Sequence, residues 1–141
     1  MRRIAVTLAL VTLAAALTGC GPGGLGVTSA MCVSWAAYES EDDLARDAQA
    51  IVTVTDIERD GSQQYLGADA AAYRTTIRSV DRGDLAVGDT LRVVSTADGC
   101  GPAYGGAADP MLGGDVLRLY LREDDGFWHT LSPFAGVVVT D

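Results

Sequence analysis

An alternation of apolar and polar side chains between Leu117 and Arg122 is the feature that most constrains the fold of this chain. Successive side chains of a β-strand point to opposite faces of a sheet, so the leucines predict a buried face, whereas Arg118, Tyr120 and Arg122 predict an exposed one. One such strand cannot bury its apolar face alone and needs several neighbours. Further β-branched or alternating segments supply these neighbours, at residues 50–57, 73–80, 90–96, 127–131 and 137–140.

Turn and helix signals divide these segments. Asp60-Gly61 and Asp125-Gly126 are typical of tight turns between strands. Ser40, followed by three acidic residues, predicts the start of a short helix, because a serine side chain caps backbone N–H groups. A stretch rich in Gly, Ala and Pro at 99–114 predicts a long mobile loop. The sequence therefore predicts an all-β domain of five or six antiparallel strands with one short helix, as a barrel or a sandwich.

The N-terminal residues have the pattern of an export signal. Arg2 and Arg3 precede an apolar run that is shorter than the roughly 20 residues needed to span a bilayer. The run closes in Leu17-Thr18-Gly19-Cys20, which resembles a bacterial lipobox, whose cysteine carries acyl chains such as palmitate. This predicts a lipoprotein signal peptide at 1–19, a lipidated Cys20 with a Gly- and Pro-rich tether at 20–31, and a folded domain at 32–141. The alternative is an ordinary signal that is cut after Ala30.

Charge limits the partners of the exported domain. The formal net charge is −9 at pH 7, and loss of the signal removes two arginines. Such acidity argues against nucleic-acid binding, which needs a basic surface, and against electrostatic docking on anionic lipids. We therefore expect the chain to be held at the cell membrane through its acyl chains alone, facing outside the cytoplasm.

The three cysteines of the chain fit this interpretation. If Cys20 is lipidated, Cys32 and Cys100 remain to pair in an oxidising compartment. A bridge that closes so long a loop is worth roughly 4 kcal/mol in the chain-entropy model. The alternative, a catalytic or metal-binding thiol pair, lacks any Cys-x-x-Cys spacing.

Four aromatic residues are the candidates for binding: Trp35, Tyr38, Tyr104 and Trp128. Aromatic side chains exposed on a small β-domain commonly form contact surfaces. The alternative is that Trp35 and Trp128 cover the ends of the barrel as part of its core.

Motifs for metal or catalytic chemistry are weak. Asp56-x-Glu58-x-Asp60-Gly61 is similar to the start of a calcium-binding loop, but the twelfth position, where a glutamate ligand is needed, is Gly67. The single histidine, His129, excludes a multi-histidine metal site, and no Gly-x-Ser-x-Gly motif supports a nucleophilic serine. We therefore expect no cofactor, no metal site and no catalytic residues.

The order of several motifs resembles a known family. They are an early cysteine, a helix before an Ala-Ile-Val strand, Tyr73 to Gly83, Cys100-Gly101, Gly113-Gly114 and Asp125-Gly126-x-x-His129. From Cys32 to about Phe134 they resemble the inhibitory domain of the tissue inhibitors of metalloproteinases, a netrin-like OB-fold. The resemblance implies an OB-like barrel, and the separation of Cys32 and Cys100 is similar to that of the family's first disulfide.

Two departures from the family bear on function. Ser34 and Ser132 stand where the family carries a further disulfide. The family chelates the zinc of its target protease with the free amine of the first cysteine, whereas residues Cys20 to Met31 precede Cys32 here, so its nitrogen is a peptide amide. We therefore expect a non-catalytic binding or scaffold module whose partner is an envelope protein or a glycan. The alternative is a protease inhibitor that acts through exosite contacts.

Overall fold

The structure is a computed structural model that describes residues 32–140. The expected signal peptide at 1–19, the lipidated Cys20 and the tether at 20–31 lie outside the described residues. The elements, in chain order, are α1 (Glu41–Asp47), β1 (Ala50–Tyr65), β2 (Ala68–Arg82), β3 (Thr90–Val94), the 3-10 helix η1 (Pro110–Leu112), β4 (Leu117–Asp124), β5 (Phe127–Thr130) and β6 (Val137–Val139). No helix within 32–140 has the length and apolar character needed to cross a bilayer.

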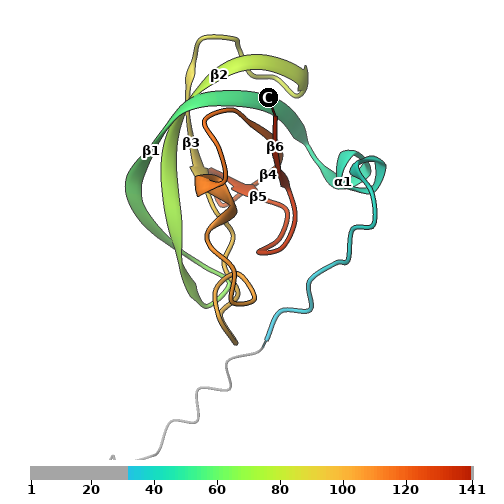
Figure 1. Cartoon of the computed structure of the whole chain (residues 1–141), viewed down its shortest axis with the longest axis vertical. Helices are drawn as coiled ribbons and strands as arrows, with labels where there is room; N and C mark the ends of the chain where they lie inside the picture. The colour runs from blue at the N-terminus through green and yellow to red at the C-terminus, as the bar shows by residue number, and fades with distance from the viewer. Residues whose placement is uncertain (1–31, 141) are drawn as a thin grey trace, which may run out of the picture.

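The strands close into a barrel, which confirms the predicted all-β class and decides between barrel and sandwich (Figure 1). The ring runs β1-β2-β3-β5-β4, and β4 returns to β1 with Ala50 opposite Leu121 and Val54 opposite Leu117. This is an OB-like barrel. The strands were expected to be antiparallel throughout, but β3 and β5 run parallel, with Val93 opposite Trp128. The long segment between β3 and β4 carries the chain past the place of β5 to the edge of β1, and the hairpin from β4 then brings β5 back between β4 and β3.

The hairpin of β1 and β2 is longer than the sequence predicts. A turn was expected at Asp60-Gly61, but β1 continues to Tyr65 and turns at Leu66-Gly67, where φ is 48° and 84°. Asp60-Gly61 instead lies within β1, whose pairing with β2 shifts register between Thr55 and Glu58 and again between Arg59 and Ser62. Bulges of this kind add twist and bend a strand, which lets the hairpin wrap around the barrel (Figure 1).

The interior of the barrel is the face that the alternation predicts. Leu117, Leu119 and Leu121 are fully buried, as predicted, and so is the β2 face that carries Tyr73, Thr75 and Ile77. Full burial of a leucine side chain is worth about 2 kcal/mol relative to exposure, so this face is the main source of stability.

Tyr120 is a correction to the expected exposed face of β4. It lies on the outer side of the barrel, yet only 2% of its surface is exposed, because it packs against Leu44 of α1 and against Leu131. Its hydroxyl donates to the Glu41 carboxylate at 2.6 Å. The predicted N-cap of this helix is confirmed, since the Ser40 side chain accepts a hydrogen bond from the Asp43 N–H.

The loop between β3 and β4, which was expected to be mobile, is held at several points. The predicted disulfide between Cys32 and Cys100 is formed and closes 68 residues. Asp109 caps η1, and the fully buried Met111 of η1 packs into the barrel core. The loop is therefore part of the fold and joins the start of the described chain to the barrel.

Candidate binding site

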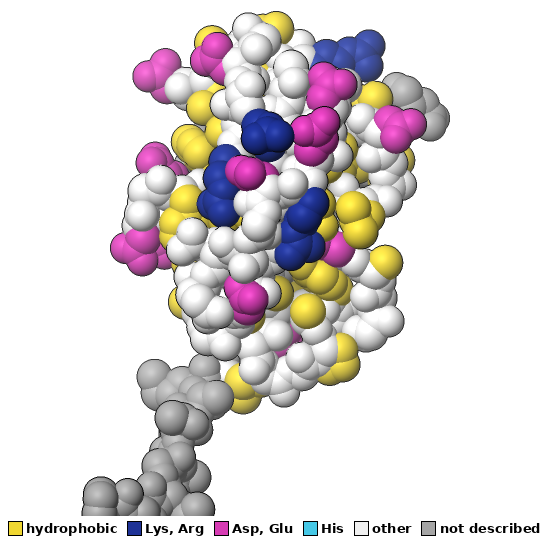
Figure 2. Space-filling model, turned by 90° about the vertical axis from the view of Figure 1, so that its left-hand side faces the viewer, with side chains coloured by type: hydrophobic (Ala, Val, Ile, Leu, Met, Phe, Trp, Pro, Cys, Tyr) yellow, Lys and Arg dark blue, Asp and Glu magenta, His cyan; other side chains and the backbone are white. Residues whose placement is uncertain are grey.

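The face formed by β1, β2 and β3 bears many charges that neutralise one another. Figure 2 shows arginine and acidic side chains interleaved on the side of the molecule that carries β1 and β2. Arg74 lies 3.1 Å from the Glu58 carboxylate, and Arg92 lies 3.3 Å from that of Asp60. Exposed pairs of this kind contribute about 0–1 kcal/mol each. Glu58 and Asp60 of the calcium-like motif are thus engaged with arginines, and this face offers no field of a single sign.

A pocket of about 340 Å³ lies between the N-terminal segment and the two hairpins of the barrel. We call it the hairpin pocket; its lining residues are Trp35, Tyr65, Arg122, Glu123, Asp124, His129 and Leu131. Tyr65 ends β1, Arg122 to Asp124 end β4, and His129 belongs to β5, so the two hairpins bring these side chains together. Trp35 comes from 32–39, which has no helix or strand and is fixed by the disulfide at one end and α1 at the other.

The hydrogen bonds of His129 define its protonation. Its Nδ1 lies 2.8 Å from the Thr130 carbonyl oxygen, which can only accept, so Nδ1 carries the proton. The neutral ring therefore accepts the Tyr65 hydroxyl at Nε2, over 3.0 Å. Burial lowers the pKa of His129, against the opposing effect of the Thr130 carbonyl. Burial, followed by the charge of Asp124, raises the pKa of Tyr65 to about 12.

Ring contacts fix the orientation of Tyr65. Its ring meets Phe127 edge to face at a centroid distance of 5.2 Å and lies 4.6 Å from the imidazole of His129. A phenol that is held on two sides loses little rotamer freedom when a ligand arrives. Tyr65 is therefore a preorganised wall of the pocket.

Several polar groups of the hairpin pocket have no partner within residues 32–140. Arg122 makes no ion pair or side-chain hydrogen bond there, and the Glu123 carboxylate accepts none. The Trp35 Nε1–H is buried without a hydrogen-bond partner. A buried donor that remains unpaired costs about 1–3 kcal/mol. The pocket thus has unused hydrogen-bonding capacity.

The four predicted binding residues do not gather at one place. Trp35 lines the hairpin pocket. Tyr38 packs beside α1 and donates to Asp47 at 3.0 Å. Tyr104 donates to Asp109 at 2.9 Å and packs on an alanine-rich cluster, while Trp128 packs against the barrel core.

Sequence reasoning missed Tyr65, Arg122 and Asp124 as site residues. Arg122 could have been found, because the alternation of β4 places it outside the barrel. Tyr65 could not, because the expected turn at Asp60-Gly61 ended β1 before it. Only the long hairpin brings Tyr65 to His129.

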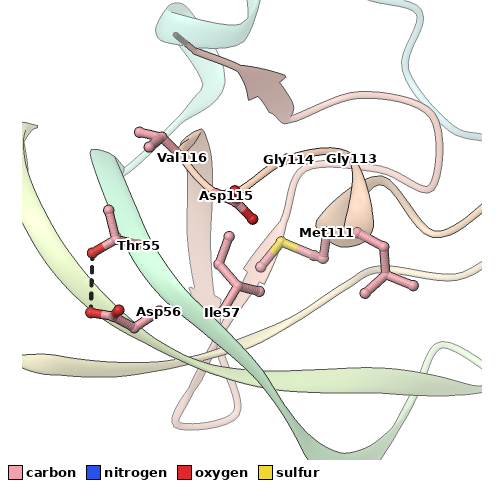
Figure 3. A pocket seen from close by; sticks show the side chains of 9 residues that line it. Thr55, Asp56, Ile57, Met111, Gly113, Gly114, Asp115 and Val116 are labelled. Carbon is pink, nitrogen blue, oxygen red and sulfur yellow. Dashed lines mark hydrogen bonds between the residues drawn. The ribbon is translucent and has the colours of Figure 1, made fainter.

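Another pocket, of about 520 Å³, opens between the β1 bulge and the connection from η1 to β4. We call it the acidic pocket; its lining residues are Thr55, Asp56, Ile57 and the run from Met111 to Val116. Figure 3 shows the side chains of Ile57, Met111 and Asp115 pointing toward its middle. Within residues 32–140, no group of three or more His, Cys, Asp or Glu side chains is arranged to hold a metal ion.

Comparison of this chain with protein-family models, with curated proteins and with solved structures finds no match.

Proposed function

We propose that this chain is a lipid-anchored, non-catalytic binding module outside the cytoplasm, and that its hairpin pocket binds a neutral saccharide of the envelope. The observation that carries the proposal is the pair of unpartnered side chains in the pocket, the Arg122 guanidinium and the Glu123 carboxylate. They lie beside aromatic rings in a pocket of about 340 Å³.

The polar lining matches hydroxyl groups better than it matches ions. A guanidinium can only donate hydrogen bonds, whereas a carboxylate can only accept them. Arg122 would repel a cation, and Glu123 and Asp124 would repel an anion. A sugar hydroxyl both donates and accepts, so it satisfies both kinds of group without bringing a charge.

The aromatic lining matches the apolar face of a sugar ring. The C–H groups of a pyranose form a flat surface that packs on indole or phenol rings, where the face of the ring is electron-rich. Trp35 and Tyr65 supply such rings, and the contacts of Tyr65 with Phe127 and His129 hold its ring in place.

Calorimetry of the full chain in detergent micelles tests the proposal with four trisaccharides. Chitotriose and maltotriose are neutral, trigalacturonate is anionic, and the glucosamine trimer is cationic. We expect at least one neutral sugar to bind about fivefold more tightly than both charged ones, and Arg122→Gln to weaken it about tenfold. Arg78→Gln, at another exposed arginine, is the matched control. Tighter binding of a charged sugar, or no response to Arg122→Gln, would contradict the proposal.

The anchor is tested separately at Cys20. Stable attachment needs two or more acyl chains, so Cys20→Ala is expected to release the protein from the membrane fraction or to block its maturation. A variant that stays fully bound after a carbonate wash would exclude the lipid anchor while leaving the saccharide site untouched.

The resemblance to tissue inhibitors supports a second candidate, protease inhibition through surface contacts. The Cys32–Cys100 disulfide, which the resemblance implies, is formed. Inhibition of a metalloprotease by the full chain, insensitive to acetylation of its amines, would favour this candidate, because chelation through Cys32 requires a free amine.

A further inference from the structure

The acidic pocket is shaped by a strained bulge and by two glycines. Asp56 has a φ of 51°, which is uncommon for a residue with a side chain, and the residue after it, Ile57, turns toward the barrel core. On the facing wall, a Cβ at Gly114 would lie 2.9 Å from Val139, and one at Gly113 would lie 3.1 Å from the Pro110 carbonyl. A side chain at Gly114 would therefore force Val139 to move, and one at Gly113 would be tightly packed against the backbone.

The pocket combines an apolar floor with an acidic rim. The fully buried Met111 and the half-buried Ile57 form the floor. At the rim, Leu112 is 67% exposed, and the carboxylates of Asp56 and Asp115 are exposed as well. No arginine lines the pocket.

The carboxylates of Asp56 and Asp115 differ in their hydrogen bonds. The Thr55 hydroxyl donates to Asp56 at 3.2 Å, and the two side chains lie together at one side of the pocket (Figure 3). Asp115 has no ion pair or side-chain hydrogen bond within residues 32–140, and its carboxylate points toward Met111 and Ile57 (Figure 3). Asp115 is thus the acid available to a group that enters the pocket.

We propose that the acidic pocket is a docking site for an arginine side chain of a partner protein in the envelope. Charge complementarity selects a cation, because the lining carries two carboxylates and no basic group. The apolar floor selects a cation on a methylene stem, which packs on apolar surface while its charged head stays at the rim. A planar guanidinium also meets a carboxylate through two parallel hydrogen bonds.

This proposal is independent of the saccharide site. The two pockets share no lining residue, and their charges differ: one is purely acidic and the other mixes both signs. A partner protein could therefore occupy the acidic pocket whether or not a sugar is bound in the hairpin pocket.

A pair of matched peptides tests the docking site. Both are acetylated and amidated and carry one central residue between leucines; that residue is arginine in one and its neutral isostere citrulline in the other. Calorimetry of the full chain in detergent micelles should show the arginine peptide binding about fivefold more tightly. Asp115→Asn should abolish this preference, and Asp69→Asn, at an exposed acid near the tip of the β1–β2 hairpin, should retain it.

The location is tested with a photoreactive version of the arginine peptide. The crosslinked residues, mapped by mass spectrometry, are expected within 55–57 or 111–116. Equal binding of the two peptides, an unchanged preference in Asp115→Asn, or crosslinks confined to other segments would overturn the proposal.

Discussion

Two clusters of tyrosine and carboxylate groups occupy different parts of the barrel, and they differ in what they leave unused. In the first, the Asp109 carboxylate accepts hydrogen bonds from the hydroxyls of Tyr73, Tyr104 and Ser95 at 2.8, 2.9 and 2.6 Å, and from the Met111 N–H at 3.0 Å. Burial raises the pKa of both phenols to about 12, and the Asp109 carboxylate adds to this effect. Every acceptor site of this carboxylate is directed at a protein donor.

In the second cluster, several hydrogen-bonding groups are left without a partner in the protein. The Tyr65 hydroxyl lies 3.0 Å from His129 Nε2 and 3.3 Å from Asp124, but it has one proton to give. The side chains of Arg122 and Glu123, beside it, have no ion-pair or hydrogen-bond partner within residues 32–140. A carboxylate whose hydrogen bonds are all made by the protein thus holds the fold together, whereas unpaired polar groups beside aromatic rings are suited to bind a ligand.

The largest effect is expected at the bond that connects the two regions. The Cys32–Cys100 disulfide joins the segment that carries Trp35 to the loop that carries Asp109. Cys32→Ser should lower the free energy of unfolding by about 4 kcal/mol, because the bridge constrains a long loop of the unfolded chain. Urea unfolding, with Ser34→Ala as control, measures this. A loss below about 1 kcal/mol would mean that the loop is held by its other contacts alone.

Paired substitutions at the two carboxylates test the comparison itself. Asp109→Ala should lower the free energy of unfolding by about 3 kcal/mol, because it leaves several part-buried donors unpaired. Asp124→Ala should lower it by less than about 0.5 kcal/mol, because Tyr65 keeps His129 as its partner. The same two proteins should show the reverse order of effect on saccharide affinity. Equal losses of stability would remove the distinction between the clusters.

A smaller effect is expected from the protonation of His129. Its pKa is lowered in the folded protein, so the unfolded chain binds the proton more readily, and stability falls as the pH drops below about 6.5 toward the folded pKa. The slope in this window is at most about 1.4 kcal/mol per pH unit, with no contribution above it. The difference in unfolding free energy between the native protein and His129→Gln isolates this group from the carboxylates. A pH-independent difference would contradict the buried neutral ring.

The sequence predicted the barrel better than the hairpin pocket, because the strands follow from local patterns whereas the pocket is made by residues that are distant in sequence. Period-two alternation and the Ser40 cap are local signals, and both were confirmed at Leu117 to Leu121 and at α1. The hairpin pocket depends on residues distant in sequence, such as Tyr65 and His129, which meet only because bulges absorb the apparent turn at Asp60-Gly61. An Asp-Gly pair has the same sequence whether it ends a strand in a turn or bends the strand in a bulge.

Tyr120 shows the same limit on the outer face. Its position in the alternation predicted exposure, and the side of the barrel was right, but the short helix that covers it could not be placed from local pattern. Covering elements are set by tertiary packing, which the alternation of one strand does not encode.

The emission of Trp35 reports on saccharide binding in the hairpin pocket, because this side chain lines it. The chain has two tryptophans, so a Trp128→Phe variant of the full chain leaves Trp35 as its single reporter. If the sugar binds there, the emission changes saturably when chitotriose or maltotriose is added; the change is lost in a further Arg122→Gln variant and kept in a further Asp115→Asn variant. An emission that stays constant while calorimetry on the same variant records saccharide binding would place the sugar elsewhere and contradict binding in the hairpin pocket.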